Sequence, residues 1–212
     1  MSEILIEGFN KTIIMVFFST LFSVILGFIP AIALIVTAPK GLKPNKGVYK
    51  TLDTIINILR GFPFLILMVA IMPFTKLLVG KSIGTTAAIV PLTIASAPFV
   101  ARIIESALKE VDPGVIEAAK SFGASNIQII YKVMLKEAVP SIISGLTLTI
   151  ISIIGYSAMA GTVGAGGLGD LAIRYGYQRY QTDIMIVTVI ILVVIVQVLQ
   201  SLGNYLYKKL SQ

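Results

Sequence analysis

The chain has 212 residues, of which 56% are hydrophobic and only 13% charged, whereas an ordinary soluble domain carries about 25% charged residues. This composition excludes an ordinary soluble domain and indicates a protein that lies in a lipid bilayer. Cysteine and histidine are both absent, which excludes disulfides, thiolate nucleophiles and imidazole metal ligands, so we expect no metal site and no cofactor. The net charge of +7 does not indicate a nucleic-acid partner, because the basic residues lie in short runs between apolar segments, where such residues set membrane topology.

Five apolar windows predict five transmembrane helices, since about 20 apolar residues are enough to cross the hydrocarbon core of a bilayer. We expect the spans at about 12–37, 54–76, 82–108, 138–160 and 184–207, within one membrane domain over 8–207. The first window lacks the short apolar region and the small-residue cleavage site of a signal peptide. We therefore expect this span to remain in the mature protein.

The Lys and Arg residues predict the orientation of these spans, because such residues concentrate in cytoplasmic loops. With the N-terminus outside and the C-terminus inside, twelve of the seventeen are cytoplasmic and five are external. The five external residues are Lys11, Lys76, Lys81, Arg174 and Arg179. Arg102 and Glu105, three residues apart near a cytoplasmic end, are expected to pair on one helix face. The predicted fold is an all-α integral membrane protein with five transmembrane helices.

A long polar stretch between the third and fourth spans predicts a cytoplasmic helix-turn-helix over 112–136. Asp112 and Pro113 are suited to start a first helix, and Gly123 is suited to the turn that ends it. Ser125 can cap a second helix. A DNA-reading role is disfavoured because the second helix carries mostly Ile, Tyr and Val rather than base-reading polar residues. An amphipathic loop that lies on the inner membrane surface stays open as the simpler interpretation.

The spelling of this loop, EAAKSFG at 117–123, resembles the EAA loop of bacterial ABC importer permeases. The family pattern is E-A-A, three residues and Gly, then nine residues to I-x-L-P; Lys136 stands here where the family has Pro. The resemblance implies that four residues couple the permease to its ATPase, namely Glu117, Ala118, Ala119 and Gly123. Small Ala residues allow a partner to approach closely, Glu117 can pair with a basic group, and Gly123 permits a positive φ.

The resemblance extends over nearly the whole chain, and the sequence is most similar to the methionine subgroup of these permeases. The stretches that carry it are NILRGFPFLI (57–66), AAIVPLTIASAPFVARIIESAL (87–108) and GYSAMAGTVGAGGLGDLAIRYGYQRY (155–180). It implies a permease subunit that forms the translocation pathway for methionine in the bacterial inner membrane. It also implies a homodimer of permeases, two copies of an ABC ATPase and an extracytoplasmic substrate-binding lipoprotein as partners.

Two glycine-rich motifs do not indicate nucleotide binding. GAGGLG at 164–169 follows a membrane span and has no preceding strand, and GKS at 80–82 lacks the first Gly of a P-loop, because Thr75 stands at that position. We therefore expect this chain not to be an enzyme, and ATP hydrolysis to take place in a separate subunit.

Met159 is the candidate gate residue of the pathway, with Tyr156 and Ser157 beside it, because the three lie near the outer end of the fourth span. Met159 could instead simply fill space between helices, since its side chain is flexible and apolar. This alternative stays open.

Three functions other than methionine import are the alternatives for a membrane protein with this sequence. A permease for another small amino acid would share the EAA loop. An ion-coupled secondary carrier would need an ionisable residue near the membrane midplane, and none is evident. A membrane scaffold without transport would not explain the EAA motif at 117–123.

Overall fold

The computed structural model describes residues 2–211, and within them every regular element is a helix, which confirms the predicted all-α class. The elements are α1 (Ser2–Thr37), α2 (Lys46–Arg60), α3 (Phe64–Ala70), α4 (Met72–Val79), α5 (Thr85–Lys109), α6 (Pro113–Ser121), α7 (Asn126–Gln128), α8 (Leu135–Gly161), α9 (Gly167–Leu171) and α10 (Thr182–Leu210), with π-helical stretches at Ile129–Met134 and Ala172–Tyr177.

Four helices are long and apolar enough to cross a membrane: α1, α5, α10 and the continuous helix Asn126–Gly161 that contains α8. The pair α2 and α3 passes the same test together, but it is bent by 99°. With the bent pair counted as one span, the number of spans is the predicted five.

The second span differs from the continuous helix expected over 54–76. Its first helix, α2, already begins at Lys46, where Asn45 accepts a hydrogen bond from the backbone N–H of Val48 at 3.1 Å. The chain then leaves the helix at Gly61 and starts α3 after Pro63, which cannot donate a backbone hydrogen bond. Non-helical backbone at membrane depth is tolerated where protein or a cavity surrounds it. The break therefore marks a place where other helices face α2 and α3.

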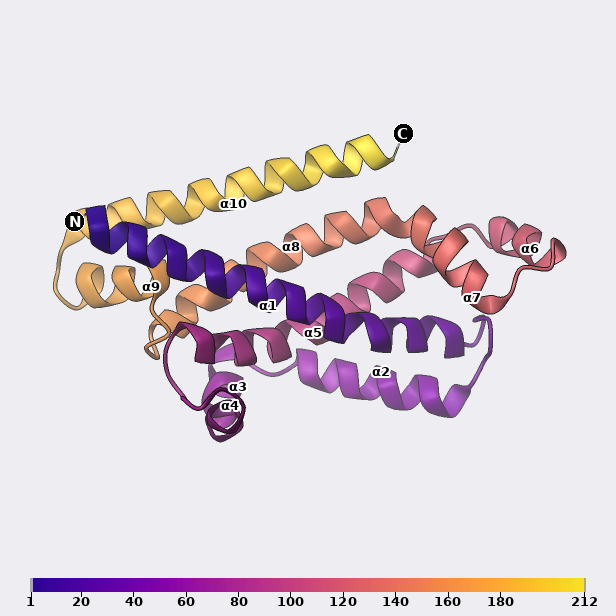
Figure 1. Ribbon diagram of the computed structural model, residues 1–212, viewed down its shortest axis with the longest axis horizontal. Helices are drawn as coiled ribbons and strands as arrows, with labels where there is room; N and C mark the ends of the chain where they lie inside the picture. Colours follow the sequence, from indigo (N-terminus) through magenta and orange to yellow (C-terminus); the bar gives the residue numbers. More distant parts are fainter. Residues whose placement is uncertain (1, 212) are drawn as a thin grey trace.

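The long helices run back and forth along the length of the molecule (Figure 1). The N-terminus, α9 and the beginning of α10 lie at one end, on the left, while α6, α7 and the connection from α1 to α2 lie at the other. The segments that the Lys and Arg pattern assigns to the cytoplasm thus gather at one end. Which end faces the cytoplasm stays a prediction.

The most extensive helix contact is that of α1 with α5, and a glycine on α1 lets the two backbones approach closely. A Cβ added to Gly27 would lie 2.7 Å from the carbonyl oxygen of Ala97, so no larger residue fits there without a shift of backbone. Two apolar clusters extend from this pair, one around Leu34 and Ile104 toward the α6 end and one around Met15 and Leu92 toward the α9 end. Together they hold α1, α5 and α8 as the body of the domain.

Candidate functional site

The loop between α5 and α8 has the caps and the turn that its sequence predicts. Asp112 accepts a hydrogen bond from the backbone N–H of Gly114 at 2.7 Å, and α6 begins at Pro113. Gly123 has a φ of +79°, a left-handed conformation that favours glycine. Ser125 and Gln128 form a reciprocal capping box, with bonds of 2.8 and 3.3 Å. The loop thus has two capped helical arms, which meet at the turn at Gly123.

The second arm of this loop does not end where the family pattern has its proline. It passes through the π-helical stretch Ile129–Met134 directly into α8, so that Asn126–Gly161 is one continuous helix. Lys136 lies inside this helix and keeps a backbone N–H, which Pro would lack. The second arm of the loop and the fourth span therefore form one continuous helix.

The loop turns part of its EAA motif outward. Glu117, Ala118 and Gly123 are exposed, whereas Ala119 is half-buried and packs against the apolar cluster around Ile104. Glu117 lines a groove of about 590 Å³ between the end of α1 and α6, and makes no ion pair within residues 2–211. Its carboxylate is thus available to a basic group of a partner.

An apolar surface adjoins the motif at the tip of the loop. The exposed fractions are 91% for Phe122, 69% for Ile127 and 54% for Tyr131. Phe122 continues the apolar stripe of α6 in sequence, but its side chain is exposed and lies just beyond the end of that helix. Exposed apolar side chains in one loop are typical of a surface that contacts a partner protein or a membrane, and Glu117 adds a charge in the same loop.

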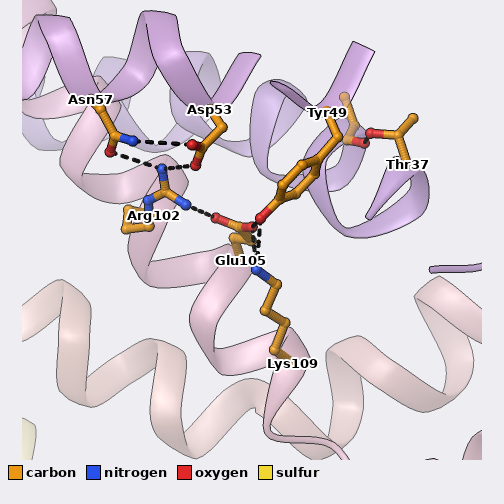
Figure 2. Close-up of polar contacts among 8 residues, drawn as sticks. Thr37, Tyr49, Asp53, Asn57, Arg102, Glu105 and Lys109 are labelled. Carbon is orange, nitrogen blue, oxygen red and sulfur yellow. Dashed lines mark hydrogen bonds and ion pairs between the residues drawn. The ribbon is translucent and has the colours of Figure 1, made fainter. Parts of the chain in front are cut away.

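A network of charged and polar side chains joins α2 to α5 (Figure 2). The predicted pair between Arg102 and Glu105 is present at 2.6 Å. Arg102 also binds Asp53 of α2 at 2.6 Å, and Lys109 binds Glu105 at 2.6 Å. Tyr49 of α2 donates its hydroxyl to Glu105 at 3.4 Å. Because Glu105 is fully buried, these partners are what make its charge tolerable.

The α2 half of this network was missed from the sequence. The second span was expected to begin at about residue 54, which left Tyr49 and Asp53 outside any helix. Their spacing carries the missing signal, because Tyr49, Asp53 and Asn57 recur every four residues and thus share one helix face. A polar face of this kind in α2 indicates a polar partner on a neighbouring helix.

The three candidate gate residues lie near the end of α8 but do not share one environment. Met159 is 46% exposed, while Ser157 is buried and donates its hydroxyl to the carbonyl of Ile154 at 2.7 Å. Tyr156 is half-buried and stacks on Phe64 of α3, with ring centroids 5.0 Å apart. Of the three side chains, only that of Met159 is exposed enough for another chain to cover it. The gate assignment stays a prediction.

Several helices able to cross a membrane and a capped helical loop exposed at one end are typical of the membrane component of a transport system. A family model described as "Binding-protein-dependent transport system inner membrane component" matches residues 23–212. The chain belongs to this family and is a multi-pass membrane protein.

Similar proteins match over nearly the whole chain. The probable D-methionine transport system permease protein MetI of Vibrio cholerae is 51% identical to this chain. The aligned region covers 98% of this chain and 92% of that protein. The methionine import system permease protein MetP of Bacillus subtilis is 46% identical over an aligned region that covers 81% of this chain and 77% of that protein. An inward-facing structure of the MetNI methionine ABC transporter has a chain that is 42% identical, with a TM-score of 0.98, and covers 100% of this chain and 98% of its own.

Proposed function

We propose that this chain is the permease subunit of a methionine ABC importer and forms the membrane pathway for methionine. The observation that carries this function is the likeness over the full length to permeases named for methionine transport, in sequence and in structure. The chain is not an enzyme, and a separate ATPase subunit hydrolyses ATP.

The assembly we propose is a homodimer of permeases on two ATPase subunits, served by an extracytoplasmic substrate-binding lipoprotein. The structural likeness to a methionine ABC transporter supports the ATPase partner, and the family description supports the binding protein. One chain offers one helix-turn-helix docking loop, so two ATPase subunits need two permeases. We assign Glu117, Ala118, Ala119 and Gly123 to this docking contact.

Methionine uptake tests the cargo. Proteoliposomes that hold the permease with its ATPase, and that receive binding protein and ATP, are expected to accumulate radiolabelled methionine. Omission of ATP, ATPase or binding protein is expected to abolish uptake. Equal uptake of an unrelated amino acid would contradict the cargo, and uptake that needs an ion gradient in place of ATP would identify a secondary carrier.

The orientation is tested with single cysteines, since the chain has none of its own. We expect Lys81→Cys to react with an impermeant thiol reagent added to intact cells, and Lys46→Cys to react only after permeabilisation. The two positions lie in segments that the Lys and Arg bias places on opposite sides. Labelling of position 46 from outside would overturn the orientation.

Met159→Ala tests the gate. With Met159 exposed in the single chain, two copies that face each other across the dimer axis can close the pathway with polarizable apolar side chains. We expect the Ala variant to hydrolyse ATP without binding protein and to leak small ions. Ile186→Ala, which truncates a similarly exposed side chain on α10, serves as the control and is expected to behave as wild type. Wild-type behaviour of Met159→Ala would return this residue to ordinary packing.

A further inference from the structure

A groove separates the end of α1 from α6, the helix that carries the EAA motif. Its volume is about 590 Å³, and its lining comes from the end of α1 with the residues that follow it, from the end of α5 and from α6. α6 has no buried residue, and its most extensive contact is with the π-helical stretch Ile129–Met134. Within residues 2–211, the groove thus leaves α6 without extensive packing against α1.

The groove lies at the level where two membrane spans end. Lys40 comes three residues after the end of α1, and Val111 comes two residues after the end of α5. At roughly 1.5 Å per residue, the 25 residues of α5 are roughly 38 Å long, which is enough for the hydrocarbon core and part of both head-group regions. The groove is at the end that the Lys and Arg pattern assigns to the cytoplasm (Figure 1). Its level is therefore that of the lipid head groups in the inner leaflet.

The lining combines a buried apolar floor with exposed lysines. Ile35, Leu108 and Met134 form part of the floor and are almost fully buried. Lys40 and Lys120 also line the groove, are exposed and make no ion pair within residues 2–211. The groove thus offers an apolar surface and two cations to the same occupant.

The charge of the lining favours an anion. Three lysines line the groove, and among the described residues Glu117 is the only carboxylate on the lining. Lys109 binds Glu105 at 2.6 Å, so Lys40 and Lys120 remain against the single carboxylate. Because the floor is apolar, an anion with an apolar tail fits this groove better than a small free anion such as phosphate.

We propose that the groove binds an anionic phospholipid of the inner leaflet, with the phosphate at Lys40 and Lys120 and an acyl chain along the apolar floor. Basic pockets between membrane helices on the cytoplasmic side bind anionic head groups. A cavity of about 150 Å³ holds one benzene molecule, so about 590 Å³ is sufficient for a head group and part of an acyl chain. The lipid contacts α1 and α6 at once and thereby links the end of a membrane span to the loop that carries the EAA motif.

Photochemical labelling of the assembled permease–ATPase complex tests the site directly. The probe is a phosphatidylglycerol with a diazirine in its acyl chain next to the head group, added to the complex in phosphatidylcholine nanodiscs. We expect peptides 35–42 and 108–116 to be labelled, and excess phosphatidylglycerol to suppress the labelling. A phosphatidylcholine with the same diazirine is expected not to label them, because its head group has no net charge. Excess inorganic phosphate is expected not to compete, because it has no acyl chain.

Matched double variants test the role of the two lysines. Lys40→Gln with Lys120→Gln is expected to weaken the apparent affinity for the phosphatidylglycerol probe about fivefold for each lysine lost. The control is Lys50→Gln with Lys136→Gln, which removes two exposed lysines outside the groove that also make no ion pair within the described residues. Its affinity for the probe is expected to stay close to wild type.

Three results would overturn the site. The first is equal labelling of these peptides by the two lipid probes, and the second is equal affinity of the two double variants for the phosphatidylglycerol probe. The third is a complex in which neither probe labels the peptides, as expected if a side chain of the ATPase fills the groove. The labelling does not depend on the cargo, so a complex that fails to import methionine contradicts the proposed function and leaves the lipid site standing.

Discussion

Glu117→Lys is expected to lower ATP-driven methionine uptake by tenfold or more, with the permease still inserted in the membrane. Glu117 is exposed, makes no ion pair within residues 2–211 and adjoins the apolar surface formed by Phe122 and Ile127. Loss of a hydrogen bond to a charged group costs about 1.5–3 kcal/mol, and the reversed charge adds repulsion to a basic partner. Co-purification with the ATPase and uptake into proteoliposomes measure the two parts of the effect.

Glu137→Lys is the matched control for this charge reversal, because Glu137 is an exposed carboxylate on α8 outside the EAA motif. It is expected to leave uptake close to wild type. Gly123→Val tests the same loop through its backbone, since a φ of +79° strains a β-branched residue by about 1–3 kcal/mol. Wild-type docking and uptake in both Glu117→Lys and Gly123→Val would remove the docking assignment.

Glu105→Ala is expected to lower the thermal stability of the detergent-solubilised permease more than any surface substitution. It leaves Arg102 and Lys109 without the carboxylate that both bind at 2.6 Å and deprives Tyr49 of its acceptor. To break a buried ion pair by removal of one partner costs about 3–5 kcal/mol. The midpoint of thermal unfolding, followed by size-exclusion chromatography of heated samples, measures the loss.

Glu110→Ala provides the comparison for this loss, because Glu110 lies just beyond α5, is exposed and has only the hydroxyl of Ser141 as a side-chain partner. We expect Glu110→Ala to lower the midpoint of thermal unfolding by only a small fraction of the loss in Glu105→Ala. The double variant Arg102→Gln with Glu105→Gln should recover part of the stability lost in Arg102→Gln, because it removes the buried charge as well. Equal midpoints for Glu105→Ala and Glu110→Ala would show that the network contributes nothing.

Local signals in the sequence were sufficient for the long spans and for the docking loop. The windows of α1, α5, α8 and α10 are apolar over the thickness of a membrane, and no partner is needed to recognise them. The caps at Asp112 and Ser125 depend on hydrogen bonds within three residues, so they too follow from the local sequence. The same holds for the pair of Arg102 and Glu105 on one helix face.

Features that depend on distant contacts were not predictable in this way. The apolar window at 54–76 is consistent with a straight helix, and only the surroundings of Gly61–Pro63 in the folded chain show the bend of 99°. Asp53 meets Arg102 across 49 residues of chain, and Tyr49 meets Glu105 across 56. Neither the bend nor these contacts leaves a pattern in hydropathy, because both are set by how α2 packs against α5.

The second arm of the loop continues without a break into α8, so the fourth span can carry a tilt of one of its ends to the other. One of its ends continues into the second arm of the loop at Asn126, and the other carries Tyr156 and Met159. At roughly 1.5 Å per residue, the 27 residues of α8 are roughly 40 Å long. A tilt of about 10° around the middle would therefore move the two ends by about 3.5 Å in opposite directions. In the homodimer that we propose, a tilt of this kind in both copies separates the ends that carry Met159 when the loop ends approach each other.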